Sequence, residues 1–451
     1  MSKILDRRGY CISANQINDE TMKQIQKETT IYPSIPIGYQ NQYIKPIINI
    51  KMNKNGTLIL PKYYGLQKFG LPDKDTLSNG YLIDISFYGE LYENQKEAVE
   101  TYLEYATNSY YKGGILSLYC GFGKTIIALY IATQLKRTTL VIAHKNFLLH
   151  QWEKAIKEFL PEAKIGKIQG KKYDTEKKDI VLGSLATLCK YQNHFHDFGF
   201  VICDEVHHMS ANTFSEVLSK INFRYSLGLS ATPIRTDKLE TVFTQHLGDI
   251  VFSKKRESQN IWVVREEYND NDDSYKEIPK FKNNMPNVSQ MVTNITQHEP
   301  RNEYISSIVS DVLQKQFSRN IIIFSERLNH LYNLAEKISC NSIGFIIGGM
   351  CEKEIQEQDG KNVLLCTYSM AQEGLDIKEL DTLVIASPKK NIQQCVGRIL
   401  RKENYNNTPL ILDIVDSFGS FKSQADERRR YYKREKYTIF HSYKDFCKYI
   451  E

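Results

Sequence analysis

Residues 114–125 read GILSLYCGFGKT, an apolar run followed by a glycine-rich turn that ends in lysine and threonine. Glycine at positions 121 and 123 lets the backbone point its N–H groups inward around a phosphate. Lys124 can then reach the β- and γ-phosphates of a nucleotide, and Thr125 can place its hydroxyl on Mg²⁺. Position 118 is leucine where the full pattern begins with glycine, so a purely structural turn is the alternative. The strand-then-helix context favours a phosphate loop made of Leu118, Tyr119, Cys120, Gly121, Phe122, Gly123, Lys124 and Thr125.

Short apolar runs alternate with amphipathic stretches on both sides of this loop. The runs form two series, 115–119, 139–143, 179–182, 200–203 and 226–229, then 320–324, 343–347, 363–366, 382–386 and 409–414. Consecutive Ile, Val and Leu predict strands buried on both faces of a parallel sheet. Stretches such as Lys124–Leu135 and Asn146–Phe159 predict helices between them. The order predicts an α/β fold with two parallel-sheet lobes.

Shifts in composition divide the chain further. Residues 1–86 lack the strand–helix rhythm and are predicted to form an N-terminal α+β accessory domain, followed by the first lobe over 87–255. Residues 256–317 lose periodicity and gather Asn, Asp and Lys, which predicts a linker or insertion. The second lobe is expected over 318–416 and a short basic, aromatic tail over 417–451.

The overall composition excludes several classes of protein. Of 451 residues, 41% are hydrophobic and 25% are charged, which is typical of globular chains. No apolar run approaches the roughly 18 residues that a membrane span needs. The nine cysteines form neither a CxxC pair nor a compact cluster, so we expect reduced thiols in a soluble, intracellular protein. The net charge of +6 permits a polyanionic partner without requiring one.

Two carboxylates follow the apolar run 200–203, within the sequence FVICDEVHH. Strands of a parallel sheet present their carboxyl ends to ligands. Asp204 is therefore a candidate Mg²⁺ ligand and Glu205 a candidate for orienting the attacking water, although a solvated strand end is the alternative. A zinc site at His207 and His208 is disfavoured, because no HExxH or cysteine pair accompanies them. We expect His207 to couple the nucleotide site to the rest of the lobe.

Two further stretches lie in the second lobe. Residues 367–377 follow a predicted strand and include Gly374 and Asp376, and residues 393–401 read QQCVGRILR. In a helix, Arg398 and Arg401 share one face and can point to a single anion, and arginine suits this because its planar fork donates in pairs. Two arginines on a solvated helix face are the alternative.

The ordered set of motifs from about residue 88 to residue 401 resembles a superfamily 2 helicase. It is most similar to the branch of the XPB-type and phage recombination helicases and the poxvirus transcript-release helicase. Its marks are the DEVH box at 204–207, the Ser-Ala-Thr triplet at 230–232 and the sequence QCVGR at 394–398. Segments 1–85 and 418–440 also look like parts of helicases from large DNA viruses. The resemblance implies two tandem RecA-like lobes.

The resemblance also implies roles for individual residues. The catalytic set would be Lys124, Asp204, Glu205, Arg398 and Arg401, with Thr125 and Asp204 holding Mg²⁺. Gln95 would hydrogen-bond the adenine, and Gly374 and Asp376 would complete the nucleotide site. Coupling residues would be His207, Ser230, Thr232 and Gln394. Nucleic-acid contacts would come from Lys145, Ser184 and Thr367, and from the segment Gln151-Trp152.

The chain departs from the family pattern at three places. Leu118 opens the phosphate loop, Tyr92 stands where arginine is common, and Cys395 stands where arginine often occurs. None of these departures removes a catalytic group. The tyrosines of the tail, at 431, 432 and 437, could stack on bases beside basic residues, or the tail could be a solvated amphipathic helix.

Together the motifs predict an ATP-dependent, Mg²⁺-using helicase or translocase that acts on DNA, single-stranded or forked. Viral transcription, replication or repair would be its setting, in the host cytoplasm or the virion, with a transcription or replication complex as partner and no membrane. The alternatives are an RNA helicase and a nucleotide-gated binding or scaffold protein. A ring-forming unfoldase is disfavoured because both arginines lie on the same polypeptide as the phosphate loop.

Overall fold

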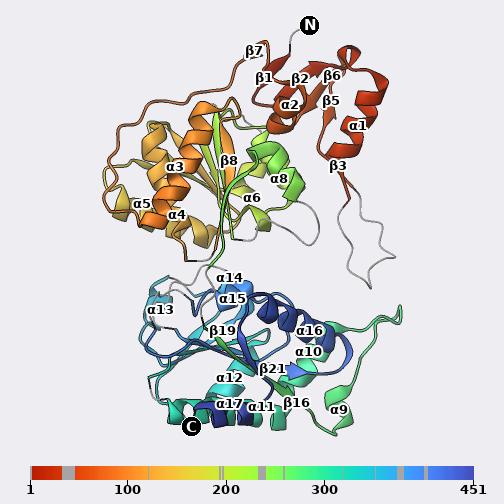
Figure 1. Ribbon diagram of the computed structural model, residues 1–451, viewed down its shortest axis with the longest axis vertical. Helices are drawn as coiled ribbons and strands as arrows, with labels where there is room; N and C mark the ends of the chain where they lie inside the picture. The colour runs from red at the N-terminus through yellow and green to blue at the C-terminus, as the bar shows by residue number, and fades with distance from the viewer. Residues whose placement is uncertain are drawn as a thin grey trace. The chain divides into compact units, whose positions relative to one another are not determined.

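The computed structural model describes residues 3–32, 46–119, 121–191, 195, 198–231, 240–256, 260–316, 318–350, 352–372, 380–400 and 405–450. The chain divides into two compact units, Met1–Lys255 and Arg256–Glu451 (Figure 1).

The N-terminal part of the first unit is a small α+β structure, as predicted. Its mixed sheet has the strand order β5-β6-β2-β1-β7, and a separate pair joins β3 and β4. Its elements are β1 (Ile4–Asp6), β2 (Gly9–Ser13), the 3₁₀ turn η1 (Ala14–Gln16), α1 (Asp19–Thr29), β3 (Thr30–Ile31), β4 (Ile47–Ile48), β5 (Lys51–Met52), β6 (Thr57–Leu60), α2 (Lys62–Phe69) and β7 (Lys74–Asp75). An apolar core from both sheet and helices, including Tyr10, Ile25 and Leu66, holds it together.

The rest of the first unit is built on a twisted sheet with the order β11-β10-β12-β9-β13-β14-β8-β15. All neighbouring strands pair in parallel except β10 with β11. Its strands are β8 (Gly113–Leu118), β9 (Thr139–Ala143), β10 (Ile165–Gln169), β11 (Lys172–Asp174), β12 (Ile180–Ser184), β13 (Phe200–Cys203), β14 (Tyr225–Ser230) and β15 (Ile250–Lys254). Its helices are α3 (Glu93–Asn108), α4 (Lys124–Leu135), α5 (Asn146–Phe159), α6 (Leu185–Lys190), η2 (Val206–His208), α7 (Ala211–Leu218) and α8 (Glu240–Leu247). A parallel-sheet first lobe is confirmed, and its bounds of 87–255 stay a prediction.

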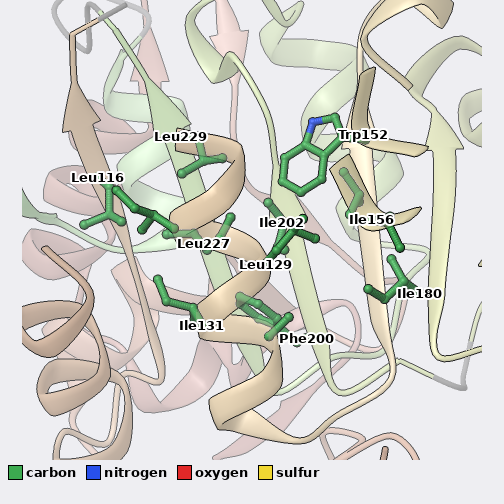
Figure 2. Close-up of a cluster of buried hydrophobic side chains, with 14 of the residues drawn as sticks. Leu116, Leu129, Ile131, Trp152, Ile156, Ile180, Phe200, Ile202, Leu227 and Leu229 are labelled. Carbon is green, nitrogen blue, oxygen red and sulfur yellow. The ribbon is translucent and has the colours of Figure 1, made fainter. Parts of the chain in front are cut away.

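Helices cover both faces of this sheet. Residues of α3, α4 and α5 pack with inward side chains of β8, β9, β12, β13 and β14 on one face. Figure 2 shows Leu129 and Ile131 of α4 beside Phe200, Ile202 and Leu227 of the sheet. Residues of α6, α7 and α8 form a second core on the other face. Apolar strands flanked by helices on both sides explain why the strand sequences are continuous hydrophobic runs.

Buried polar contacts join the N-terminal part to the sheet of the first unit. The Tyr63 hydroxyl lies 3.0 Å from the Ser226 hydroxyl at the start of β14. Asn49 donates its amide to Gln245 of α8 at 2.7 Å. Because such groups lose water on burial, their pairing fixes the two parts to each other.

The second unit contains a parallel sheet with the order β18-β19-β17-β20-β21-β16-β22. Its strands are β16 (Trp262–Tyr268), β17 (Ile321–Ser325), β18 (Ile343–Ile346), β19 (Val363–Thr367), β20 (Thr382–Ile385), β21 (Leu410–Asp416) and β22 (Thr438–Phe440). Its helices are α9 (Asp273–Lys276), α10 (Val288–Gln297), α11 (Glu299–Lys315), α12 (Leu328–Lys337), α13 (Glu352–Gln356), α14 (Tyr368–Gln372), α15 (Gln393–Val396), α16 (Gly419–Arg434) and α17 (Tyr443–Ile450). Two apolar cores again line the two faces of the sheet. The fold is therefore α/β, with two RecA-like parallel-sheet lobes.

The expectation of a linker or insertion over residues 256–317 is wrong for much of this segment, which belongs to the second unit. Strand β16 pairs in parallel with the whole of β21. Arg301 of α11 forms a fully buried ion pair with Asp416 at the end of β21, with Nε to Oδ1 at 2.8 Å. Tyr275 donates its hydroxyl to the same carboxylate at 2.6 Å. Because the sequence around residue 270 is polar, its pattern did not indicate that Arg301 and Tyr275 would be buried against Asp416.

The tail expected over residues 417–451 is also built into the second unit. Arg428 of α16 is buried against Asp413, with Nη2 to Oδ1 at 2.8 Å, and Tyr432 donates to that carboxylate at 3.0 Å. Strand β22 extends the sheet beside β16. The buried face of α16 excludes the freely solvated helix. Across the part of the chain that the structure describes, we find no helix long and apolar enough to span a membrane.

Candidate nucleotide site and nucleic-acid surface

Parallel pairing brings the predicted nucleotide residues to one edge of the first sheet. Strands β13, β14 and β8 are consecutive neighbours, with Cys203 level with Gly228 and Ser230 level with Ser117. The phosphate loop after β8, the acids after β13 and Ser230 at the end of β14 therefore share the carboxyl edge. This is the edge where open α/β sheets bind ligands.

The phosphate loop has the backbone conformation that its glycines allow. Gly121 and Gly123 have φ values of +91° and +88°, in the region that favours glycine. Helix α4 begins at Lys124, and Thr125 follows in its first turn. The N–H groups of that turn lack helical partners and suit an anion. Cys120 lies outside the described residues.

Lys124 reaches from the loop to the acids. Its Nζ lies 3.2 Å from Glu205 Oε1 and 3.5 Å from the Leu118 carbonyl oxygen. Glu205 itself has φ +49°, which is uncommon for a residue with a side chain and is typical of functional sites. The opposite charges of lysine and glutamate thus face each other beside the loop.

Asp204 is the buried member of the acid pair. Its carboxylate accepts a hydrogen bond from the indole N–H of Trp152 at 2.8 Å. Burial, and next the neighbouring Glu205 carboxylate, raise the pKa of Asp204 to about 6, while the Trp152 bond and Lys124 oppose the rise. Trp152, expected near the nucleic acid, is instead almost completely buried on the inner face of α5 (Figure 2). Its hydrogen bond positions this acid.

The donor set here fits Mg²⁺. A buried carboxylate lacks water to stabilise its charge, and a divalent cation would supply that stabilisation. Asp204 and the hydroxyl of Thr125 are oxygen ligands of the kind that Mg²⁺ prefers. Among the described residues there is no group of three or more His, Cys, Asp and Glu that could hold a metal ion.

His207 links the acids to β14. Its Nδ1 lies 3.3 Å from Glu205 Oε2 and 2.9 Å from the Ser230 hydroxyl. One imidazole nitrogen therefore contacts both the water-orienting candidate and the first residue of the Ser-Ala-Thr triplet. Thr232 lies outside the described residues.

Gln95 contacts the phosphate loop directly. Its amide donates to the Phe122 carbonyl at 2.8 Å and accepts from the Tyr92 N–H at 3.0 Å. A Cβ added at Gly123 would lie 2.4 Å from the Gln95 amide nitrogen, and the positive φ at this position favours glycine as well. The predicted contact of Gln95 with adenine stays a prediction.

In the second unit the arginine segment differs from expectation. Helix α15 ends at Val396, and Arg398 follows in a turn in which its N–H bonds the Cys395 carbonyl at 3.0 Å. The predicted helical face shared by Arg398 and Arg401 is therefore wrong for Arg398, which is buried rather than solvated. Gln394 lies within α15. Arg401, Gly374 and Asp376 lie outside the described residues.

Comparisons with known proteins identify the family. Residues 88–235 match the model "Type III restriction enzyme, res subunit", and residues 303–403 match "Helicase conserved C-terminal domain". A protein of Acanthamoeba polyphaga mimivirus named "Putative ATP-dependent RNA helicase" is 35% identical over 96% of this chain and 86% of its own length. The chain belongs to the superfamily 2 helicases. As a member of this family it hydrolyses ATP and binds nucleic acid.

Other proteins similar to this helicase are more distant. An African swine fever virus protein, also named "Putative ATP-dependent RNA helicase", is 27% identical over 72% of this chain and 69% of its own length. The helicase domain of Pyrococcus furiosus Hef aligns with a TM-score of 0.49 at 15% identity, over 73% of this chain and 98% of that chain.

The predicted nucleic-acid residues of the helicase lie at strand ends. Lys145 follows β9 as the N-cap of α5, and Ser184 ends β12 as the N-cap of α6. Because β9 and β12 are neighbours, with Ser184 level with Ala143, these two residues come to the same edge of the first sheet. Thr367 ends β19 in the second unit, with its hydroxyl 3.0 Å from that of Ser369.

Sequence reasoning gives the wrong role to one residue. The resemblance implies that Trp152 contacts nucleic acid, yet its indole N–H donates to Asp204. The spacing of apolar residues at 148, 149, 152 and 156 placed it on the buried face of a helix, and a buried indole N–H needs an acceptor. This need for an acceptor was the one sign in the sequence that Trp152 bonds a polar group inside the lobe.

Proposed function

We propose that this helicase moves along a single strand of nucleic acid by coupling ATP hydrolysis to closure of its two lobes. The observation that carries the proposal is the contact of Lys124 with Glu205 next to the buried Asp204, at the carboxyl edge of the first sheet. A lysine on the phosphates, an acid for the metal and an acid for the water are the parts that phosphoryl transfer requires.

Each residue has a distinct task in this proposal. Lys124 binds the β- and γ-phosphates, and Asp204 with Thr125 would hold Mg²⁺, which when bound neutralises phosphate charge. Glu205 orients the attacking water and accepts its proton. Trp152 fixes the orientation of Asp204, and His207 relays the state of Glu205 to Ser230.

Arg398 and Arg401 complete the site from the second lobe. The transition state of phosphoryl transfer carries charge on the γ-phosphoryl oxygens, and guanidinium groups stabilise that charge. Because the two arginines lie on another lobe, hydrolysis would require lobe closure. Gly374 and Asp376 would approach the nucleotide in the same movement, and Gln394 would couple that movement to the strand.

The nucleic-acid strand would be bound by Lys145 and Ser184 of the first lobe and by Thr367 of the second. Contacts to the phosphate backbone carry no sequence information, so binding should be salt-sensitive and tolerant of sequence. We favour DNA as the strand and the branch of XPB-type and viral transcript-release helicases as the nearest functional group. Viral transcription, replication or repair would be the setting.

RNA is the second candidate strand. The mimivirus and African swine fever virus relatives are both named as RNA helicases. The residues at the ends of the β-strands would contact the sugar–phosphate backbone, which DNA and RNA both have.

A panel of nucleic acids tests the proposal. ATP hydrolysis is measured at low salt with single-stranded DNA and RNA of equal length, with duplexes, and with forked substrates. The proposal expects strong stimulation by single strands, greatest for DNA. Greater stimulation by RNA would establish the second candidate, and hydrolysis indifferent to every nucleic acid would contradict translocation.

A further inference from the structure

A tight hairpin closes one side of the first sheet. Strands β10 and β11 pair antiparallel, with Gln169 opposite Lys172, so only residues 170 and 171 form the turn. Gly170 has φ +59°, as the first position of a two-residue hairpin turn requires. The hairpin tip, defined here as residues 170–173, reads GKKY.

The hairpin tip lies at the edge assigned to the nucleic acid. Strand β10 runs parallel to β12, with Ile168 level with Gly183, so the end of β10 and Ser184 lie at the same edge. The Gly170 N–H donates to the Thr187 hydroxyl at 3.0 Å, and Thr187 belongs to α6, which begins directly after Ser184. The tip therefore continues the row of strand ends after β9 and β12.

Tyr173 at the tip is both exposed and held in place. Its residue surface is 47% exposed. Its ring lies 5.3 Å from the ring of Tyr191 and 6.1 Å from that of Phe195, measured between centroids. A ring supported by two aromatic neighbours loses little freedom on binding and leaves part of its surface open.

Lys171 and Lys172, which directly precede Tyr173, are exposed. Two other lysines of the same region form ion pairs, Lys167 with Glu153 and Lys178 with Asp174. For Lys171 and Lys172, by contrast, the described part of the chain contains no ion pair. The alternative role for lysines on an edge strand is to prevent association with other sheets. An exposed aromatic ring that directly follows two exposed lysines, at the same sheet edge as Ser184, indicates a further use.

We propose that the hairpin tip binds single-stranded nucleic acid, with Tyr173 stacking on an unpaired base and Lys171 and Lys172 contacting phosphates. The inference rests on the proposed function and assigns its preference for single strands to a specific contact with unpaired bases. Stacking suits any base because each base presents a π-face, whereas the faces of paired bases are covered by their neighbours. The site therefore favours single strands over duplexes.

The ring is tested by binding of fluorescein-labelled twelve-nucleotide oligo-dT and oligo-U, and of a blunt duplex, to the full chain. Y173L keeps an apolar side chain against Tyr191 and Phe195 but has no π-face, and Y173F keeps the ring. We expect Y173L to lose about 5- to 50-fold in single-strand affinity with duplex affinity changed less than about twofold, and Y173F to bind as wild type. The matched control is Y332L, a half-exposed tyrosine of the second unit that packs on Phe345.

The lysines are tested by the salt dependence of the same binding. The double variant K171A/K172A should lower the slope of log affinity against log salt by about 1.4, because each single-strand phosphate contact contributes about 0.7. K276A/K282A, which removes two exposed lysines elsewhere, should leave the slope unchanged. Thermal unfolding of each variant verifies folding.

Three outcomes separate the proposals. If wild type binds single strands and both Y173L and K171A/K172A bind equally well, the hairpin inference is wrong and the proposed function stands. If Y173L and Y173F lose affinity together, the hydroxyl and not the stacking ring is responsible, which also overturns the inference. If wild type binds no nucleic acid, the proposed function itself fails.

Discussion

The indole N–H of Trp152 donates to the carboxylate of Asp204 across 2.8 Å, and both side chains are buried. This contact joins helix α5 to the acid that follows β13, 52 positions later in the sequence. Groups that orient a metal ligand typically contribute about 10- to 100-fold in metal affinity or activity.

Trp152→Phe should therefore weaken Mg²⁺-dependent ATP hydrolysis by about 10- to 100-fold while keeping an aromatic ring in the core. The measurement is the ATPase rate as a function of Mg²⁺ concentration, in which the half-saturating concentration should rise. Trp262→Phe, in the second unit, is the matched control. An unchanged Mg²⁺ dependence in Trp152→Phe would show that Asp204 needs no such support.

The contact between Lys124 and Glu205 supports a second prediction. Glu205→Gln keeps the size of the side chain but removes the base, so it should retain ATP binding and lose about 10²- to 10⁴-fold in turnover. Calorimetry measures ATP binding and a steady-state assay measures turnover. Glu216→Gln, at an exposed ion pair of α7, should change neither. Full turnover by Glu205→Gln would refute the assigned role.

His246 makes the stability of the first unit depend on pH. Its Nε2 lies 2.9 Å from the Asn49 side-chain oxygen and 3.0 Å from the Ser215 hydroxyl, and burial, followed by the charge of Lys51, lowers the pKa of His246 to about 3. Unfolded histidine has a pKa near 6.5, so the unfolded chain binds the proton first. Stability is complete above pH 6.5 and is lost as pH falls toward 3, by about 2 kcal/mol at pH 5.

The check is the free energy of unfolding at pH 7.5 and pH 5 for wild type and His246→Gln. The variant cannot bind the proton, so its pH dependence should be smaller by about the same 2 kcal/mol. An identical pH dependence in both proteins would place the acid sensitivity elsewhere.

The buried pair of Arg301 and Asp416 predicts that α11 is an integral part of the second unit. Arg301→Met should destabilise the second unit by about 3–5 kcal/mol, because it leaves the Asp416 carboxylate buried without its cation. Denaturant unfolding measures this loss. Arg327→Met, at a more exposed position on the same unit, is the control. A loss below about 1 kcal/mol for Arg301→Met would contradict an integral role.

The central strands could be predicted because their sequences carry the signal. Strand β13 spans Phe200–Cys203, as predicted, since a short run of consecutive apolar residues between helical stretches is typical of a strand buried on both faces. Strands at or next to a sheet edge could not be found this way. Strand β11, at the edge of the first sheet, reads KYD, and β16, which only the short β22 separates from the edge of the second sheet, reads WVVREEY. Both contain the polar residues that an exposed position permits.

The candidate site was predictable in its residue types but not in its contacts. Lys124, Asp204 and Glu205 follow from motif spacing, and the structure brings them together. The helical spacing indicated that the Trp152 indole is buried and needs an acceptor, but no local pattern indicated that this acceptor is Asp204 or that Glu205 has a positive φ, because both depend on distant packing. Helix α15 ends at Val396, with Gly397 as its C-cap, so Arg398 lies outside the helix on which the predicted face with Arg401 depended.

The most direct test of the account concerns Arg398. ATP hydrolysis with saturating single-stranded DNA is compared for wild type, Arg398→Ala and Arg430→Ala, the last an exposed arginine of α16. If Arg398 stabilises the γ-phosphoryl transition state from the second lobe, Arg398→Ala should lose about 10³-fold or more in turnover while a folded chain still binds ATP, and Arg430→Ala should hydrolyse as wild type. Turnover by folded Arg398→Ala within a few-fold of wild type would contradict a catalytic site completed by both lobes.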